Sequence, residues 1–327
     1  MKRIENTIIA GHALAQYDID AVSVSPISQS GAAVFKVEDD RGLLYSLRVH
    51  KSKSSTLEKI WTHQDVLDSE LVWLDALNRE TGLILPVPKR NRQGSYVTQV
   101  DETNCTMLGW VAGEQKPYFT SEQELKSTAE MTAALHRQAS TWQPPSSFVR
   151  PTYNSARVRV ALDMLNQRVS EGLLDEHDVR ILNAAGEKAI AMLDALPKNK
   201  QTWGVLHNDL IPGNIVYVDG GASPIDFGAS GFGFLLNDLA CTFCFIYPST
   251  RQQYIEWYGK HFPLPNDHEV QLEGFFIASR LTSMIHFLGL PDANVWIPTD
   301  VHKSACREFG RYANGERFLF TGTPFWE

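Results

Sequence analysis

Apolar residues recur at helical spacing over residues 6–17, and Asp18 and Asp20 end that pattern. Three short runs rich in β-branched and aromatic residues follow, at residues 22–24, 32–37 and 43–49. Turn-forming residues separate the runs, as in the polar segment 39–42. Short strands joined by tight turns are typical of an antiparallel meander. The chain is therefore predicted to continue from a helix into a β-sheet.

An amphipathic stretch from Thr56 to Arg79 predicts a second helix, because its leucines and valines fall near one face. Residues 86–92 are expected to form an extended connector. Two further strands are predicted after it, over residues 95–100 and 105–111. The first third of the chain is thus predicted to be a five-stranded antiparallel sheet with one inserted helix.

Helical periodicity dominates after Gly113. Ser121, with Glu124 three residues later, predicts a capping box at the start of a helix that ends near Ala139. Residues 142–153 are expected to form a stiff, irregular linker. Further helices are predicted over residues 155–171, 176–195 and within 237–315. The pattern indicates an α+β protein with a small β-rich lobe, a hinge near residues 109–113 and a larger, mostly helical lobe.

Two short polar motifs carry the candidate chemistry. Residues 207–214 are His-Asn-Asp-Leu-Ile-Pro-Gly-Asn, and residues 225–228 are Ile-Asp-Phe-Gly. An Asp, an Asn five residues later and a second Asp twelve residues beyond form the acidic and amide set of an ATP-dependent phosphoryl-transfer site. Such a reaction needs a metal on the phosphates and a hydroxyl aimed in line. Asp209 suits the second task, and Asn214 and Asp226 suit the first.

Composition narrows the expected partners and location. The chain has 327 residues and a formal net charge of −8, which disfavours nucleic acid and anionic membranes as partners. Its four cysteines are too few for a disulfide scaffold. Polar residues interrupt the N-terminal apolar segment, which argues against a signal peptide, and no apolar run is long enough to span a membrane. We therefore expect a cytoplasmic protein, whose oligomeric state the sequence does not predict.

The order of elements and motifs resembles the aminoglycoside phosphotransferase and choline kinase family, which has the protein-kinase-like fold. The resemblance extends over residues 20–315 and is strongest over residues 206–240, where Asn237-Asp238-Leu239-Ala240 follows the two motifs. It implies an ATP-dependent small-molecule kinase. It also implies a two-lobed architecture, with a nucleotide-binding lobe at residues 1–111 and a catalytic and substrate-binding lobe at residues 112–327.

The same resemblance implies a role for each motif residue. Asp209 would orient and deprotonate the acceptor hydroxyl. Asn214 and Asp226 would ligate the Mg²⁺ that bridges the phosphates of ATP. His207 would be a scaffold residue bonded to the loop backbone, and Asp238 would brace the catalytic loop from the start of its helix.

Nucleotide contacts are also implied by the resemblance. Arg48 lies where the family has its phosphate-binding cation, and Glu70 lies where the family has the acid that pairs with it. Ser30 belongs to the segment that stands in place of a glycine-rich loop over the phosphates. Adenine is expected to bond to the carbonyl of Gly109 and the N–H of Val111.

The chain departs from the protein kinases in ways that bear on its substrate. Arg48 stands where protein kinases have Lys; arginine keeps its charge and can bind two phosphate oxygens at once. Only nine residues separate Gly228 from Asp238, and no Ala-Pro-Glu sequence is present. A phosphorylated activation loop does not fit there, which favours a small-molecule substrate.

The acceptor is expected to be a small molecule with a hydroxyl group: an amino alcohol, a hydroxy amino acid such as homoserine, or an aminoglycoside-like compound. Acidic residues of the helical lobe are candidates for binding its ammonium group. Two alternatives stay open, a nucleotide-binding regulatory protein without transfer and a compact bacterial Ser/Thr protein kinase. The presence of Asp209, Asn214 and Asp226 argues against the first, and the short segment after Gly228 argues against the second.

Overall fold

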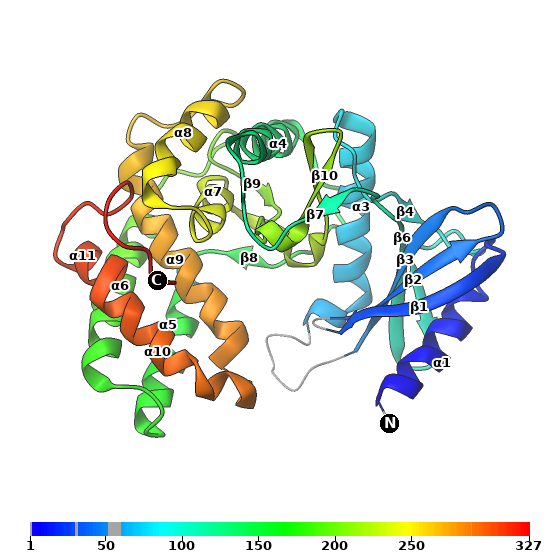
Figure 1. Ribbon diagram of the computed structural model, residues 1–327, viewed down its shortest axis with the longest axis horizontal. Helices are drawn as coiled ribbons and strands as arrows, with labels where there is room; N and C mark the ends of the chain where they lie inside the picture. The colour runs from blue at the N-terminus through cyan, green and yellow to red at the C-terminus, as the bar shows by residue number, and fades with distance from the viewer. Residues whose placement is uncertain (1, 30–31, 52–59, 289) are drawn as a thin grey trace. The chain divides into compact units, whose positions relative to one another are not determined.

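The computed structural model describes residues 2–29, 32–51, 60–288 and 290–327. The chain forms two compact units (Figure 1). Unit 1 comprises Met1–Glu114, Gln143–Arg150 and Ser223–Gly228, and unit 2 comprises Gln115–Trp142, Pro151–Ala222 and Ala229–Glu327. The lobe boundary at residue 111 stays a prediction. Unit 1 also contains two later segments, Gln143–Arg150 and Ser223–Gly228, that are not part of the predicted nucleotide-binding lobe.

Unit 1 is built on an antiparallel sheet. Its strands are β1 (Ala21–Gln29), β2 (Ala33–Asp39), β3 (Leu44–His50), β4 (Pro88–Lys89), β5 (Val97–Val100) and β6 (Thr103–Gly109). Their order is β1-β2-β3-β6-β4, and β5 also pairs with β6. The sheet is the predicted meander with one addition, the two-residue strand β4 inside the predicted connector, where Pro88 pairs with Leu108.

Helix α1 (Lys2–Leu14) packs on this sheet and forms one hydrophobic core with it. Along β2 the buried positions alternate with more exposed ones, as expected of a strand with one face on a core. Ile9 and Ala13 of α1 lie in the same buried cluster as Phe35, Leu47 and Met107. Apolar burial of this kind supplies most of the stability of a small lobe.

Helix α3 (Gln64–Glu80) is the predicted inserted helix, but it begins later than Thr56. The turn Ile60–Thr62 is a 3₁₀-helix and His63 is the N-cap of α3, while the predicted residues 56–59 lie outside the described residues. The buried face of α3 includes Leu71 and Trp73, as the amphipathic pattern predicts.

Unit 2 is mostly helical. Its helices are α4 (Glu122–Thr141), α5 (Ser155–Ser170), α6 (Glu176–Ala195), α7 (Leu236–Phe243), α8 (Pro248–Gly259), α9 (His268–Leu288), α10 (Ile297–Ser304) and α11 (Gly310–Ala313). Helix α9 packs against α5, α6 and α7 (Figure 1). Its buried side chains include Phe275, Phe276 and Leu281. Among the described residues, no helix has both the length and the apolar composition needed to cross a membrane.

Short strands position the motif loops. They are β7 (Glu114–Gln115), β8 (Thr152–Tyr153), β9 (Trp203–Leu206), β10 (Ile215–Val218), β11 (Gly221–Pro224) and β12 (Gly231–Phe234). Strand β12 runs antiparallel to β9 and parallel to β8, so β12 is the central strand of its sheet. This pairing places the loop that follows β9 near α7, the helix that follows β12.

Half of the predicted capping box is present at the start of α4. Ser121 Oγ accepts the N–H of Glu124 at 3.2 Å. The Glu124 carboxylate, however, accepts the N–H of Thr120 at 2.7 Å and pairs with Lys116 at 2.7 Å. The carboxylate of Glu124 therefore bonds to the amide one residue upstream of the N-cap, and not to the N-cap amide.

Candidate active site

The loop between β9 and β10 carries Asp209 and Asn214, and side-chain hydrogen bonds join them. Asn214 Nδ2 donates to Asp209 Oδ2 at 2.6 Å and to the backbone carbonyl of Asp209 at 3.1 Å. The 3₁₀ turn Pro212–Asn214 returns the chain so that these two residues meet. Two of the predicted site residues therefore lie side by side in unit 2.

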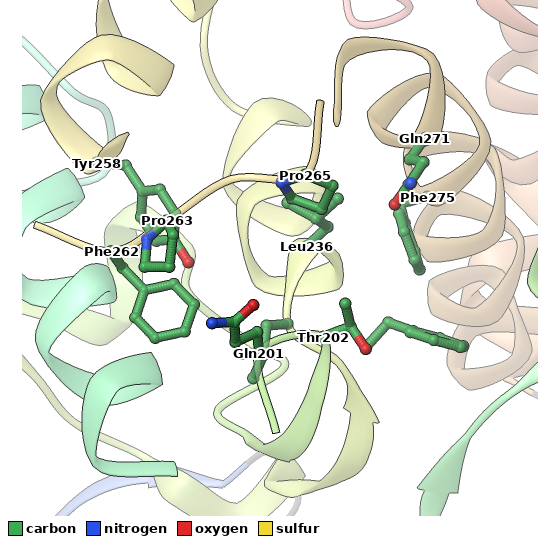
Figure 2. A pocket seen from close by; sticks show the side chains of 11 residues that line it. Gln201, Thr202, Leu236, Tyr258, Phe262, Pro263, Pro265, Gln271 and Phe275 are labelled. Atoms are coloured by element: carbon green, nitrogen blue, oxygen red, sulfur yellow. The ribbon is translucent and has the colours of Figure 1, made fainter. Parts of the chain in front are cut away.

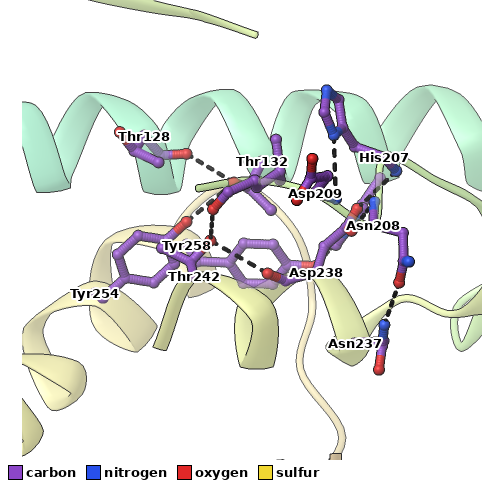
Figure 3. A network of polar contacts seen from close by, with 12 residues as sticks. Thr128, Thr132, His207, Asn208, Asp209, Asn237, Asp238, Thr242, Tyr254 and Tyr258 are labelled. Carbon is purple, nitrogen blue, oxygen red and sulfur yellow. Dashed lines mark hydrogen bonds and ion pairs between the residues drawn. The ribbon is translucent and has the colours of Figure 1, made fainter. Parts of the chain in front are cut away.

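Asp238 lies in the first turn of α7, and its carboxylate binds backbone N–H groups of this loop (Figure 3). Its Oδ2 accepts the N–H of His207 at 3.1 Å and its Oδ1 accepts the N–H of Asn208 at 2.6 Å. Asn208 has a φ of 61°, in the left-handed region that Asn tolerates better than most residues. The predicted bracing role of Asp238 is confirmed, and its fully buried carboxylate fixes the strained residue next to Asp209.

His207 also acts on the loop, as predicted for a scaffold residue. Its side chain is fully buried, and its Nδ1 accepts the N–H of Asp209 at 3.3 Å. Thr242 adds a bond from α7, since its Oγ1 donates to the carbonyl of Leu210 at 3.0 Å. Backbone groups on both sides of Asp209 are thus bonded to buried side chains.

A buried histidine from another helix completes the support of Asp238. His136, on α4, places Nε2 at 3.2 Å from Asp238 Oδ2 and Nδ1 at 2.7 Å from the hydroxyl of Tyr258. Burial raises the pKa of Tyr258 well above its usual value, so its hydroxyl keeps its proton. Tyr258 can then donate to His136 Nδ1, and His136 donates from Nε2 to the carboxylate.

Asp226 lies in the Ser223–Gly228 segment of unit 1, whereas Asp209 and Asn214 lie in unit 2. Its φ is 59°, and its exposed carboxylate accepts the N–H of Gly228 through Oδ1 at 3.4 Å. A Cβ at Gly228 would come within 3.2 Å of the same oxygen, so a larger residue there would require the carboxylate to shift slightly. The convergence of Asp226 with Asp209 and Asn214 around a nucleotide stays a prediction.

The Asp226–Gly228 turn is anchored within unit 1. The ring of Phe227 meets Trp73 of α3 edge to face, with centroids 5.6 Å apart. Arg150 Nη2 donates to the carbonyl of Gly228 at 2.6 Å, and its Nη1 donates to the carbonyl of Val66 in α3 at 2.8 Å. Both contacts tie the second motif to α3.

Arg48 and Glu70, predicted to be partners, form a buried ion pair. Arg48 Nη1 lies 2.7 Å from Glu70 Oε1, at an angle outside hydrogen-bond geometry. The two side chains are 8% and 1% exposed, so water screens the pair little. Arg48 stands where protein kinases have lysine, and it pairs with Glu70 as the family resemblance implies.

The remaining predicted nucleotide contacts lie at the end of the sheet or outside the described residues. Gly109 is the last residue of β6, and its N–H donates to the carbonyl of Val87 at 2.8 Å. Val111 follows two residues later, before the chain passes into unit 2. Ser30 lies outside the described residues.

A small pocket within unit 2 is not part of this site (Figure 2). Rings of Tyr258, Phe262, Pro263 and Phe275 line it, and its volume is about 10 Å³. A cavity of that size holds no more than one water molecule. None of the predicted site residues lines it, so we interpret it as a packing void.

Arg150 and His136 are two supporting residues that the sequence motifs do not indicate. Arg150 precedes Pro151 in the segment predicted as a stiff linker, and His136 lies in the middle of a helix. The lone signal for His136 was its position among the apolar residues of α4, which indicates burial and not a partner. The partners of both residues are distant in sequence.

The sequence matches the model of the phosphotransferase enzyme family over residues 23–271. No curated protein sequence matches the chain. Similar solved structures include a microcompartment-associated aminopropanol kinase, with 20% identity, a TM-score of 0.77 and coverage of 96% of this chain and 100% of that chain. An amicoumacin kinase in complex with AMP-PNP, Ca²⁺ and Ami has 14% identity, a TM-score of 0.75 and 98% coverage of both chains. APH(2″)-IIia in complex with GDP and kanamycin has 14% identity, a TM-score of 0.64 and coverage of 95% and 99%.

The structural matches confirm the predicted α+β, kinase-like fold with two lobes, since they extend over nearly the whole chain. The family match includes both motifs, from β9 to α7, together with Arg48 and Glu70. The chain belongs to the phosphotransferase enzyme family, and is by that membership an ATP-dependent phosphotransferase that acts on small molecules.

Proposed function

We propose that the chain transfers the γ-phosphoryl group of ATP to a hydroxyl of a small amine, such as an amino alcohol, a hydroxy amino acid or an aminoglycoside-like compound. The observation that carries the proposal is the braced loop, in which Asn214 holds the carboxylate of Asp209 at 2.6 Å. A carboxylate fixed in this way suits a general base, which must meet the hydroxyl in one orientation. The aminopropanol kinase and the kanamycin complex support an acceptor that carries nitrogen.

Asp209 would act on the acceptor. Asp209 is only partly buried, as a residue that meets an acceptor must be. The carboxylate accepts the hydroxyl proton while the hydroxyl oxygen bonds to the γ-phosphorus and the bridging oxygen of ADP leaves. Burial and the nearby Asp209 carboxylate raise the pKa of Cys241 well above its usual value, so that Cys241 stays a neutral thiol beside the base.

The residues present fit a magnesium ion. Among the described residues, both side-chain hydrogen bonds of Asn214 use Nδ2, so Oδ1 is available as a ligand. This oxygen and the exposed carboxylate of Asp226 are both hard oxygen donors of the kind that Mg²⁺ prefers. No group of three or more His, Cys, Asp or Glu in the described ranges can hold a metal alone. Asn214 and Asp226 would therefore hold the ion together with phosphate oxygens, and bound Mg²⁺ would neutralise charge on the phosphates.

Arg48, Glu70, Ser30, Gly109 and Val111 complete the proposed nucleotide site. Arg48 would bind phosphate oxygens, while Glu70 holds it in place through the ion pair described above. The Gly109 carbonyl and the Val111 N–H would bond to adenine, at the end of β6. Ser30, which follows β1 in the sequence, would contact the phosphates.

A panel of hydroxylated amines, hydroxy amino acids and aminoglycosides tests the proposed acceptor class. We expect magnesium-dependent ATP consumption with at least one class and none with matched amines that lack the hydroxyl. Consumption should be followed as ADP release, and the product identified by mass. If magnesium-ATP raises the melting temperature but no acceptor is phosphorylated, the regulatory alternative is favoured.

Asp226→Asn is expected to weaken binding of magnesium-AMP-PNP by about tenfold or more, or about 1.4 kcal/mol. Asn keeps the left-handed backbone at this position but removes the charge that attracts the ion. Calorimetric titration measures the effect. Asp101→Asn is the matched control, because Asp101 is also exposed with a φ of 52° but lies in the turn between β5 and β6. An unchanged Kd in Asp226→Asn would contradict the metal assignment.

A further inference from the structure

Arg48 lies in a buried polar cluster on the sheet of unit 1. Thr106 of β6 is directly opposite Arg48 in the β3–β6 register, and His50 lies two residues along β3 on the same face. Arg48, His50 and Thr106 are 7%, 8% and 0% exposed. Such a buried polar cluster costs stability unless its hydrogen bonds are complete.

The proton positions in this cluster follow from the chemistry of its members. Arg48 Nε lies 3.1 Å from Thr106 Oγ1, and because a guanidinium only donates, the hydroxyl must accept. The hydroxyl proton of Thr106 is then directed to His50 Nε2, at 2.9 Å. Burial, reinforced by the Arg48 charge, lowers the pKa of His50 well below its usual value, so the ring is neutral and can accept.

The three nitrogens of the Arg48 guanidinium therefore differ in their partners. Nε is bound by Thr106, and Nη1 is paired with Glu70. Nη2 is buried and meets no acceptor within the described part of the chain. A buried cationic donor without an acceptor is unfavourable, and a phosphate oxygen is the acceptor that an arginine in a nucleotide site would meet.

We propose that Thr106 and His50 are positioning residues, which hold the Arg48 guanidinium so that Nη2 is presented to a nucleotide phosphate. The proposal rests on the proposed function, because the phosphate is that of ATP. It also accounts for arginine in place of lysine. A lysine has one nitrogen, which cannot bond to Thr106, pair with Glu70 and reach a phosphate with the fixed geometry of a guanidinium.

Thr106→Val tests the proposal, since it removes the hydroxyl with little change of volume. We expect the Kd for magnesium-AMP-PNP to rise about tenfold, the effect of losing one hydrogen bond to a charged group. Thr106→Ser, which keeps the hydroxyl, should restore most of the affinity. His50→Leu should give a smaller rise, because it removes only the acceptor that orients the hydroxyl.

Thr98→Val is the matched control. Thr98 is a fully buried threonine of the same sheet, and its hydroxyl bonds to Tyr17 at 3.1 Å and to Asn91 at 3.0 Å. It should lower the melting temperature as Thr106→Val does and leave nucleotide affinity unchanged. Equal Kd values for the two valine variants, or no recovery in Thr106→Ser, would overturn the positioning role.

The binding assay needs no acceptor, which separates this proposal from the proposed function. Wild-type protein that binds magnesium-AMP-PNP but phosphorylates nothing contradicts the transfer reaction and leaves the comparison of variants decisive for Thr106 and His50. Wild-type protein that does not bind the nucleotide overturns the positioning role as well.

Discussion

Asp209→Ala is expected to lower kcat by about 10²–10⁴-fold, the usual cost of losing a positioned general base. Nucleotide affinity should change little, because the variant removes neither a proposed metal ligand nor Arg48. One partner lost is Nδ2 of Asn214, a partly buried residue whose amide can bond to water instead. Steady-state rates with a saturating acceptor, together with calorimetric binding of magnesium-AMP-PNP, measure both quantities.

Glu187→Ala serves as the control for Asp209→Ala. Glu187 is an exposed carboxylate on α6 whose nearest cation, Arg159, lies 3.7 Å away and is itself exposed. Such surface pairs contribute little, so rate and affinity should stay at wild-type values. A wild-type rate in Asp209→Ala would refute the assigned base.

Asp238→Ala is expected to cause the largest loss of stability among these variants, about 3–5 kcal/mol. The change leaves the amides of His207 and Asn208 and the Nε2 of His136 without their buried acceptor. Denaturant unfolding measures the loss. Activity should fall as well at temperatures where the variant is folded, because the backbone next to Asp209 is released.

Asp238→Asn and Asp39→Ala separate the loss of stability from the loss of activity. Asp238→Asn keeps one acceptor oxygen and should lie between wild type and Asp238→Ala in both stability and kcat. Asp39 is a buried carboxylate of unit 1 that accepts the amides of Arg41 and Leu43 and the hydroxyl of Tyr45. Its removal should destabilise the protein with kcat retained. If Asp238→Ala unfolds like wild type, the bracing carboxylate is not a major source of stability.

Local signals made much of the fold predictable. The periodicity predicts a helix over residues 176–195, and α6 spans Glu176–Ala195. The start of α4 is also predictable, because the Ser121 side chain accepts the N–H of Glu124 only three residues later. The spacing of Asp209 and Asn214 was informative for the same reason, since a single turn joins them.

Contacts between distant residues are not predictable where neither the motifs nor the family resemblance indicates them. His136 and Asp238 are 102 residues apart, and Arg48 and Thr106 are 58 apart. Both His136 and Thr106 are buried polar residues, and a hydrophobicity pattern cannot reveal what a buried polar group bonds to. The sequence does not predict strand β4, because two residues in a proline-containing segment show no alternation and form a strand only by pairing with β6.

The three-segment composition of unit 1 restricts how this enzyme can be divided or recombined. Trp73 and the carbonyl of Val66 have their partners in Phe227 and Arg150, which come from the two later segments. A fragment that ends at Glu114 would lack both partners. A chimaera with a relative's nucleotide-binding half must therefore exchange three stretches of sequence, because a single crossover would split one folding unit.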